Sequence, residues 1–297
     1  MSQYICVDIG GTSIKHGVLD ENAIIKECNQ TKTEAWLGGA AVLDKVKTIG
    51  KQYKEQYENI EGICISTAGM VDPEEGKIVF AGELMPGYTG TCIKKELEKA
   101  LEMPCEVEND VNCAGLAEYV SGSAKESHIM FCATVGTGIG GCAIVNGRVF
   151  HGASNSACEV GYIPMGDSDF QTLGASSILV RKVAEKKIEP LDMWDGKKIF
   201  ALAEKGDKVC ISAIKEMCDV LGKGLATICY VLNPDTIVLG GGIMAQKKIL
   251  ENEIRDSLNR YLRPILAEHL QVCFAEYGNE AGMVGALYNF QNKCGRK

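Results

Sequence analysis

Asp8 and the glycines after it form the first group of residues whose types and spacing could do chemistry. An apolar run, residues 4–7, leads into this acid, and Gly10, Gly11 and Thr12 follow it. Neither glycine has a Cβ, so the backbone can approach a ligand closely there. A carboxylate beside a ring of N–H donors suits a magnesium-bound polyphosphate: the acid holds the metal or its water shell, and the N–H groups meet phosphate oxygens. The same pattern also fits an ordinary β-hairpin with a Gly-Gly turn.

The strand–turn–strand plan returns once further along the chain, and a third glycine cluster follows another strand-like run. Residues 129–149, IMFCATVGTGIGGCAIVNGRV, read as strand, glycine- and threonine-rich turn and strand, and a glycine cluster follows the apolar residues 236–239. The first two turns lead into a second strand and not into a helix, which excludes the dinucleotide-binding fingerprint, and no GxxxxGK[ST] loop is present. Two such units far apart in the sequence indicate two related half-domains.

A second candidate acid stands in the pair Asn109-Asp110, where a short expected strand, residues 104–108, meets a helix. This junction places a carboxylate near several N–H donors, where an acid can also serve only as a helix cap. Glu106 and Glu108 alternate along the same strand and compete with Asp110 for any role as a base. The spacing alone leaves the three acids open.

These motifs together resemble the ROK family of sugar kinases, within the hexokinase/actin superfamily. DIGGT, residues 8–12, is similar to the first phosphate motif of that family, and TVGTGIGG, residues 134–141, to the second. VLGGGI, residues 238–243, is similar to the adenosine motif. The resemblance runs in order over nearly the whole chain.

The resemblance implies an α/β, two-lobed, ribonuclease-H-like fold with a central cleft, and ATP and Mg²⁺ as cofactors. Chain order and the family together predict a small lobe of residues 1–115 plus 281–297 and a large lobe of residues 116–280. No low-complexity segment or Pro/Gly/Ser-rich linker separates them. Amphipathic spacing predicts a helix over residues 35–57, with Val42, Val46, Ile49 and Tyr53 on its buried face.

The family also implies roles for individual residues. Asp110 matches its catalytic base and Asn109 a ligand of sugar hydroxyls, while Gly69 lies in a loop that would face the sugar or merely connect a strand to the next element. Glu159 matches the glutamate of the ExGH motif, which grips sugar hydroxyls. Lys15 could add a cation for phosphate, or be a solvated surface lysine. The expected ATP-binding residues are Asp8, Gly10, Gly11, Thr12, Lys15, Gly136, Thr137, Gly138, Gly240, Gly241 and Gly242, with Asp8 also on magnesium, directly or through water.

The chain departs from the family around the sugar's first two carbons. Tyr162 stands where the ExGH histidine, a zinc ligand in many members, is normal, and the downstream CxCGxxGC cluster is replaced by PMGDSDFQTL, residues 164–173. We therefore expect no structural zinc. The shortened loop and an aromatic ring leave room for an aglycone, which favours the 6-hydroxyl of a glucose unit in a β-glucoside such as cellobiose as acceptor. Glucose or an N-acetylated hexosamine such as N-acetylmannosamine is the alternative, and Tyr162 could instead only fill the space of the lost zinc loop.

The composition is that of an ordinary globular protein that works in a reducing compartment. A net charge of −8 argues against nucleic acid or an anionic membrane as partner. Fourteen cysteines, none at CxxC spacing, and the absence of a signal-peptide pattern favour buried thiols in the cytoplasm over a disulfide framework. The uncharged residues 129–147 are long enough to span a membrane, but their glycines and polar side chains favour a buried hairpin.

Two other classes of protein remain to be weighed. ROK members include sugar-responsive repressors, which carry a helix-turn-helix ahead of the first motif, whereas only seven residues precede Asp8 here. An actin-like or chaperone-like ATPase without a sugar site predicts no role for Asn109, Asp110 and Glu159. Family members are often dimers, so the resemblance implies a homodimer that takes a sugar and ATP.

Overall fold

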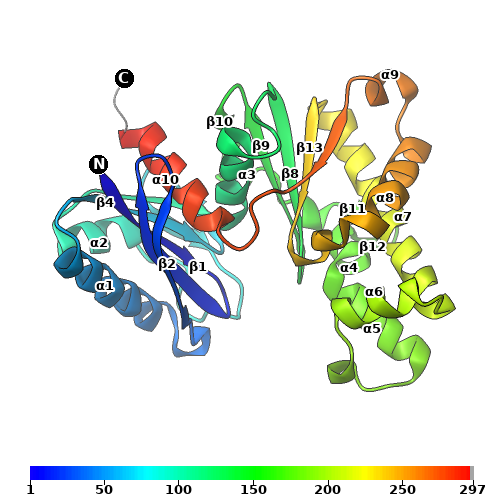
Figure 1. The fold of residues 1–297 in the computed structure, drawn as a ribbon, viewed down its shortest axis with the longest axis horizontal. Coiled ribbons are helices and arrows are strands. Elements are labelled where there is room, and N and C mark those ends of the chain that lie inside the picture. The colour runs from blue at the N-terminus through cyan, green and yellow to red at the C-terminus, as the bar shows by residue number, and fades with distance from the viewer. Residues whose placement is uncertain (295–297) are drawn as a thin grey trace. The chain divides into compact units, whose positions relative to one another are not determined.

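The computed structural model describes residues 1–294, and the chain divides into two compact units (Figure 1). Unit 1 comprises Met1–Gly122, His151–Ala157 and the segment from Asn279 onward. Unit 2 comprises Ser123–Phe150 and Cys158–Gly278. The chain therefore leaves unit 2 at His151 for seven residues and returns to it at Cys158.

Unit 1 is built on a mixed sheet whose strand order is β3-β2-β1-β4-β7. β1 pairs antiparallel with β2, and β2 with β3, whereas β4 runs parallel to β1 and β7 parallel to β4. A small hairpin of β5 and β6 follows β4. The strands are β1 (Gln3–Ile9), β2 (Ser13–Asp20), β3 (Ile25–Lys32), β4 (Ile60–Thr67), β5 (Met70–Asp72), β6 (Lys77–Phe80) and β7 (Cys105–Asn109).

Helices cover the sheet of unit 1 on both faces because its central strand is apolar on both. Ile5 and Val7 of β1 belong to a core with Val42 and Val46 of α1, while Tyr4, one residue along, meets the ring of Phe290 of α10 at 5.4 Å. Helix α10 also packs along α3. The helices are the 3₁₀ turn η1 (Ala35–Leu37), α1 (Gly39–Gln56), α2 (Ile93–Leu101), α3 (Asp110–Ser121) and α10 (Ala281–Cys294).

Unit 2 repeats the same sheet plan, with the order β10-β9-β8-β13-β14. β8, β9 and β10 are antiparallel, and β13 and β14 run parallel to β8. The expectation of two related half-domains of α/β class is thereby confirmed. The strands are β8 (Ile129–Val135), β9 (Ile139–Val145), β10 (Arg148–Val149), β11 (Pro164–Met165), β12 (Ser168–Asp169), β13 (Thr236–Gly240) and β14 (Gln271–Phe274), of which β11 and β12 form a separate hairpin.

Helix α7 organises the rest of unit 2, because α4, α5, α6 and α8 all pack against it. Asp207 caps its start by accepting from the N–H groups of Val209 and Cys210, and the helix ends at Leu232, with Asn233 as its cap ahead of Pro234. The helices are η2 (Val160–Tyr162), α4 (Phe170–Gly174), α5 (Ser176–Lys187), η3 (Leu191–Met193), α6 (Gly196–Glu204), α7 (Lys208–Leu232), η4 (Gly242–Gln246), α8 (Lys247–Tyr261) and α9 (Pro264–Ala267).

The unit boundaries differ from the expected lobes at three places, the smallest being residues 279–280, which belong to unit 1 and not to the large lobe. Residue 115, the expected end of the small lobe, falls inside α3, which belongs to unit 1 throughout. Residues 151–157 also belong to unit 1, whereas the sequence placed them in the large lobe. The physical reason is a long-range bond: the His151 ring lies 2.8 Å from the Glu108 carboxylate of β7.

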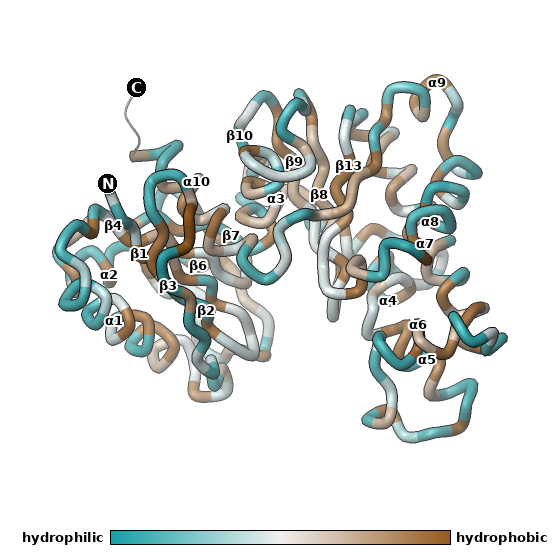
Figure 2. The backbone as a smooth tube through the Cα atoms, in the orientation of Figure 1, coloured by the Kyte–Doolittle hydropathy of each residue, from teal (hydrophilic) through white to brown (hydrophobic). Residues whose placement is uncertain are grey.

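The local expectations hold best where periodicity is strong. Helix α1 alternates between hydrophilic and hydrophobic colour in Figure 2, and Val42, Val46, Ile49 and Tyr53 are buried as predicted. Helix α8 ends at Tyr261, and Pro264 begins the separate short helix α9.

Most of the cysteines are buried, which agrees with the expected role as core thiols. Among residues 1–294, no helix has the length and apolarity needed to cross a membrane.

Gly285 is the tightest point of the α10–α3 contact. A Cβ at this position would lie 1.8 Å from the backbone oxygen of Cys113 in α3. Because a backbone atom cannot swing aside, we expect Gly285→Ala to lower the free energy of unfolding by about 3 kcal/mol. Gly196→Ala at the start of α6, where nothing lies within 4 Å, should be neutral or stabilising. Urea unfolding of both variants measures this, and equal stabilities would contradict the close approach.

Candidate active site

Asp8 lies at the end of β1, where the neighbouring strand and helix both close on its carboxylate. Its Oδ1 accepts a 2.7 Å hydrogen bond from the hydroxyl of Ser66, its register partner on β4. Gly282 of α10 approaches so closely that a Cβ there would lie 2.5 Å from the carboxylate carbon. Burial raises the pKa of Asp8, although the Ser66 bond and the charge of Lys15 both oppose this.

The first glycine turn, between β1 and β2, is held from outside by Thr33. The Thr33 hydroxyl donates to the Gly10 carbonyl at 2.6 Å, and its N–H donates to the Thr12 carbonyl at 3.0 Å. Gly11 has nothing within 4 Å of its Cβ position, so its backbone is open to a ligand. The ammonium of Lys15 donates to the Asn279 carbonyl at 3.1 Å, so this lysine is bonded within unit 1.

Asn109 is the cap of helix α3, and its side chain is fully used by the protein. The Oδ1 atom accepts from the N–H groups of Val111 and Asn112, and the Nδ2 group donates to the Gly69 carbonyl at 2.9 Å and to Asp110 Oδ1 at 3.0 Å. An asparagine amide offers two donor hydrogens and two lone pairs. A sugar hydroxyl can therefore reach Asn109 only in exchange for one of these bonds.

Asp110 is the first residue of α3, and one of its oxygens is left over. Oδ1 accepts from the Asn109 amide and from the N–H of Val111, while no other residue among 1–294 donates to Oδ2. Burial, and next the negative charge of Asp8, raise the pKa of Asp110 to about 7. A carboxyl group whose pKa is near neutrality and that has a free oxygen is suited to accept a proton.

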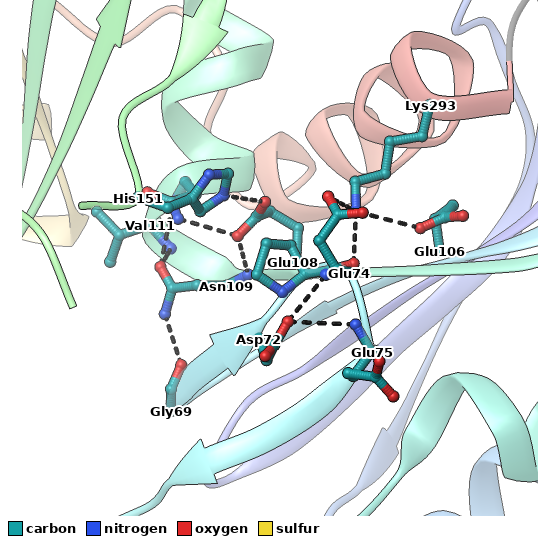
Figure 3. A network of polar contacts seen from close by, with 12 residues as sticks. Gly69, Asp72, Glu74, Glu75, Glu106, Glu108, Asn109, Val111, His151 and Lys293 are labelled. Atoms are coloured by element: carbon teal, nitrogen blue, oxygen red, sulfur yellow. Dashed lines mark hydrogen bonds and ion pairs between the residues drawn. The ribbon is translucent and has the colours of Figure 1, made fainter. Parts of the chain in front are cut away.

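The two competing acids of β7 are both engaged elsewhere. Glu106 forms an ion pair with Lys94 at 2.7 Å. Glu108 is bonded to His151 and to the N–H of Asn109 (Figure 3). Strand alternation put these acids on a face with Asp110, but β7 ends at Asn109 and Asp110 already belongs to the helix. Of the three candidate acids, Asp110 is therefore the one whose carboxylate is not taken up by an ion pair or by His151.

The second glycine turn, between β8 and β9, is clamped by the first two residues of α5. Ser176 donates to the Gly136 carbonyl through its N–H at 3.0 Å and its hydroxyl at 2.6 Å. The Ser177 hydroxyl donates to the Thr137 carbonyl at 2.7 Å. These bonds occupy the carbonyl groups of Gly136 and Thr137, and the Gly136 N–H donates to the Gly138 carbonyl at 2.9 Å, so the N–H groups of Thr137 and Gly138 are the ones left for a ligand.

A cavity of about 550 Å³ within unit 2 joins this turn to the third glycine cluster. Thr137 and Gly242 both line it, together with residues of α5 and α6. Gly240 and Gly241 are not among its lining residues: Gly240 belongs to β13, and a Cβ on Gly241 would lie 2.3 Å from the Val135 carbonyl oxygen. The lining is Thr137, Ser176, Ser177, Val180, Asp195, Gly196, Lys197, Phe200, Gly242, Ile243, Ala245 and Gln246.

Glu159 directly precedes the short helix η2 and Tyr162 is its last residue, also within unit 2. Glu159 precedes the helix, and burial raises the pKa of its carboxyl group. Tyr162 is 60% exposed, which disfavours the interpretation that its ring only fills space. The side chain of Gln171 reaches this region, since a Cβ at Gly138 or Gly161 would lie within 3 Å of its oxygen.

The residues that sequence reasoning missed are partners at long sequence separation. Each of these partners contacts a candidate residue that is far away in the sequence, and the shortest separation is the 21 positions from Thr12 to Thr33. The partners are Thr33, Ser66, His151 and Gly282. No local spacing signals such contacts. Among residues 1–294, no group of three or more His, Cys, Asp or Glu side chains is arranged to hold a metal ion.

The raised pKa of Asp110 predicts how the free energy of unfolding depends on pH. Its folded-state pKa of about 7 lies above the ordinary value of 3.8, so the folded protein binds the extra proton and loses stability as the pH rises toward 7. Asp110→Asn removes this loss. Because Asp110 is partly exposed, we expect the stabilisation by Asn to grow by only about 1 to 2 kcal/mol between pH 5 and pH 8. Urea unfolding without metal, beside the exposed control Asp44→Asn, tests this; a pH-independent difference would refute it.

Comparisons with known proteins agree with the geometry of both units. The ROK family model matches residues 4–293. A β-glucoside kinase of Klebsiella pneumoniae is 31% identical over 95% of this chain and 94% of its own, and a glucokinase of Halalkalibacterium halodurans is 28% identical over 95% and 93%. The crystal structure of a ROK family glucokinase from Streptomyces griseus, in complex with glucose and AMPPNP, superposes with a TM-score of 0.83 at 28% identity, over 97% of this chain and 98% of that one. With a family match over nearly its whole length and both phosphate motifs in equivalent turns, this chain belongs to the ROK family.

Proposed function

We propose that this protein transfers the γ-phosphoryl group of ATP to the 6-hydroxyl of a glucose unit, with a β-glucoside such as cellobiose as the favoured acceptor. The coarser statement is plain from the relatives: the chain is a sugar kinase. The observation that carries the proposed phosphoryl transfer is Asp110, a carboxyl group with a free oxygen and a pKa of about 7.

In the proposed reaction, Asp110 is the general base. As the sugar O6–Pγ bond forms and the bond from Pγ to the β-phosphate oxygen breaks, the hydroxyl proton passes to Asp110 Oδ2 and ADP leaves. A plain carboxylate suffices, because the acidity of the alcohol rises as the bond forms. Asn109 binds a sugar hydroxyl by releasing its bond to Asp110, which also frees the base. Gly69, whose carbonyl accepts from Asn109, borders this sugar site.

The phosphates lie at the two glycine turns in this proposal. Gly11 and Thr12 would offer N–H donors from unit 1, and Thr137 and Gly138 from unit 2. Gly10 and Gly136 close the two turns instead, because their N–H groups donate to the Ser13 and Gly138 carbonyls. The cavity beside Thr137 and Gly242 takes the adenosine. Gly240 and Gly241 then act by shaping the backbone, and Lys15 adds positive charge behind the first turn.

Magnesium fits Asp8, because Mg²⁺ is commonly bound through one or two carboxylates plus substrate phosphates and not by a cage of protein ligands. Asp8 is the acid at the first turn, and its bond from Ser66 leaves Oδ2 for the ion or its water shell. When bound, the ion would neutralise charge on the phosphates. The donor set of PMGDSDFQTL holds no cysteine, so we propose no structural zinc.

The β-glucoside preference rests on the region around Tyr162. Its ring is exposed and directly follows Gly161, against which Gln171 packs, and residues 164–169 form only a short hairpin. Glu159 would hold sugar hydroxyls here, and the exposed ring offers a stacking surface for an aglycone. Glucose and N-acetylmannosamine are the alternative acceptors. A homodimer in the cytoplasm completes the proposal.

The acceptor is tested by coupled ADP release with Mg-ATP and glucose, cellobiose, gentiobiose, N-acetylmannosamine or N-acetylglucosamine, each with the wild type and Asp110→Asn. We expect the disaccharides to turn over and Asp110→Asn to lower kcat by about 10³-fold, because the hydroxyl proton then has no acceptor.

Each result points to a different part of the proposal. Turnover of a single monosaccharide alone would refute the β-glucoside preference and leave the base in place. Full activity of Asp110→Asn would remove Asp110 as the base. ADP release that no sugar stimulates would count against the acceptor site as a whole.

Gly282 tests the role of Asp8 without altering its charge. An added methyl group at this position displaces the Asp8 carboxylate, so we expect Gly282→Ala to raise the KM for Mg-ATP or lower kcat by about 10-fold or more. Gly278→Ala, where nothing lies within 4 Å, is the matched control. Unchanged kinetics in folded Gly282→Ala would mean that the position of Asp8 does not matter to turnover.

A further inference from the structure

Glu108 is a buried carboxylate that the proposed chemistry does not use. Its side chain is 1% exposed, and it lies on β7 directly before Asn109. A buried carboxylate is costly unless donors surround it. Glu108 has three: the backbone N–H of Asn109 at 2.8 Å and the amide of Asn112 at 2.9 Å on Oε1, and the His151 ring at 2.8 Å on Oε2.

Two of these donors belong to the strand-to-helix junction itself. Glu108 accepts from the N–H of Asn109, the last residue of β7, and from the side chain of Asn112 in the first turn of α3. These two bonds fix the direction of α3 relative to β7. Asn109 in turn orients Asp110 through its amide. Figure 3 shows the path from His151 through Glu108 to Asn109 and on to the Gly69 carbonyl.

The third donor comes from a part of the chain that is far away in sequence. His151 begins the seven-residue excursion into unit 1, and the loop closes on itself because the Ala157 N–H donates to the His151 carbonyl at 3.0 Å. Gly152 and Asn155 have φ of +72° and +57°, which few other residues adopt readily. The excursion is thus a shaped loop anchored on Glu108, and it ends two residues before Glu159.

Glu106 provides an internal comparison on the same strand. Its carboxylate is nearly as buried as that of Glu108, but its partners are the ammonium groups of Lys94 at 2.7 Å and Lys293 at 3.5 Å. An ion pair with lysines contributes to packing between β7 and its flanking helices. Glu108 instead bonds the backbone of the site, so the two acids should differ in what their removal changes.

We propose that Glu108 and His151 are positioning residues that hold Asn109 and Asp110 in the geometry for sugar binding. The inference rests on the proposed function for its kinetic consequences, though not for its structural ones. The His151 ring bonds Oε2 of Glu108, which keeps the carboxylate oriented so that Oε1 accepts from the Asn109 N–H. Without His151, the carboxylate can turn toward other donors and the junction loses its fixed direction.

Kinetics of His151→Ala and His151→Gln give the first test. We expect His151→Ala to raise the KM for the sugar about tenfold and the KM for ATP less than twofold, because only the sugar side depends on the junction. His151→Gln keeps a donor near the position of Nε2 and should recover most of the loss. Glu106→Gln and His269→Ala, an exposed histidine, are the controls and should leave the KM for the sugar unchanged.

Hydrogen–deuterium exchange of the residues 105–116 gives a second test that needs no activity. The N–H groups of Asn109, Val111 and Asn112 all bond to side chains of the junction, so their exchange should accelerate several-fold in His151→Ala and return toward wild type in His151→Gln. Glu106→Gln should leave these amides unchanged.

The two tests together separate the possible failures. Unchanged exchange in His151→Ala would overturn the positioning role, whatever the kinetics. Faster exchange in a protein whose wild type shows no sugar-stimulated turnover would sustain the positioning role and count only against the proposed function. An equal loss for sugar and ATP in His151→Ala, with no recovery in His151→Gln, would show a general structural role and also overturn the inference.

Discussion

Helix α10 approaches its neighbours so closely that two of its positions admit only glycine, and the candidate site depends on this contact. Gly282 lies on the Asp8 carboxylate and Gly285 on the backbone of Cys113 in α3. The two glycines are three residues apart and therefore share a face of the helix. One helix thus sets the distance between the end of β1, which carries Asp8, and the helix that begins with Asp110. The last helix of the chain brings together motifs that are about a hundred residues apart.

This closeness has an electrostatic consequence. Burial raises the pKa of both Asp8 and Asp110, and the charge of Asp8 adds to the effect on Asp110. Two carboxyl groups that resist ionisation lower the stability of the folded protein at neutral pH. A structural role would not require this arrangement, since asparagine in either place would keep most of the hydrogen bonds. This loss of folding stability is expected at a site whose carboxyl groups must accept a proton and attract a divalent cation.

The sequence predicted the parts of the site that are local. Glycine turns between apolar strands, and the Asn-Asp pair at a strand-to-helix junction, follow from spacing, and the sheet of each unit is formed as expected. The sequence did not show which residue of the pair caps the helix and which has a free oxygen, because asparagine and aspartate both cap helices well. Only the structure shows that Asn109 is the cap, which leaves an oxygen of Asp110 free. Likewise, nothing local connects Glu108 with His151, 43 positions later.

The repeated sheet plan explains why the two turns differ in chemistry. Counted from the glycine after each first strand, Gly10 and Gly136, the position of Asp8 in unit 1 corresponds to Thr134 in unit 2. Across the sheet, Ser66 stands beside Asp8, whereas Gly240 stands beside Thr134. One copy of the plan therefore carries an acid with a hydroxyl that binds it, and the other carries neither. The second turn therefore has neutral N–H donors and no carboxylate, whereas the first turn carries an acid that can hold a cation. The asymmetry agrees with the proposed place of magnesium at Asp8 of the first turn.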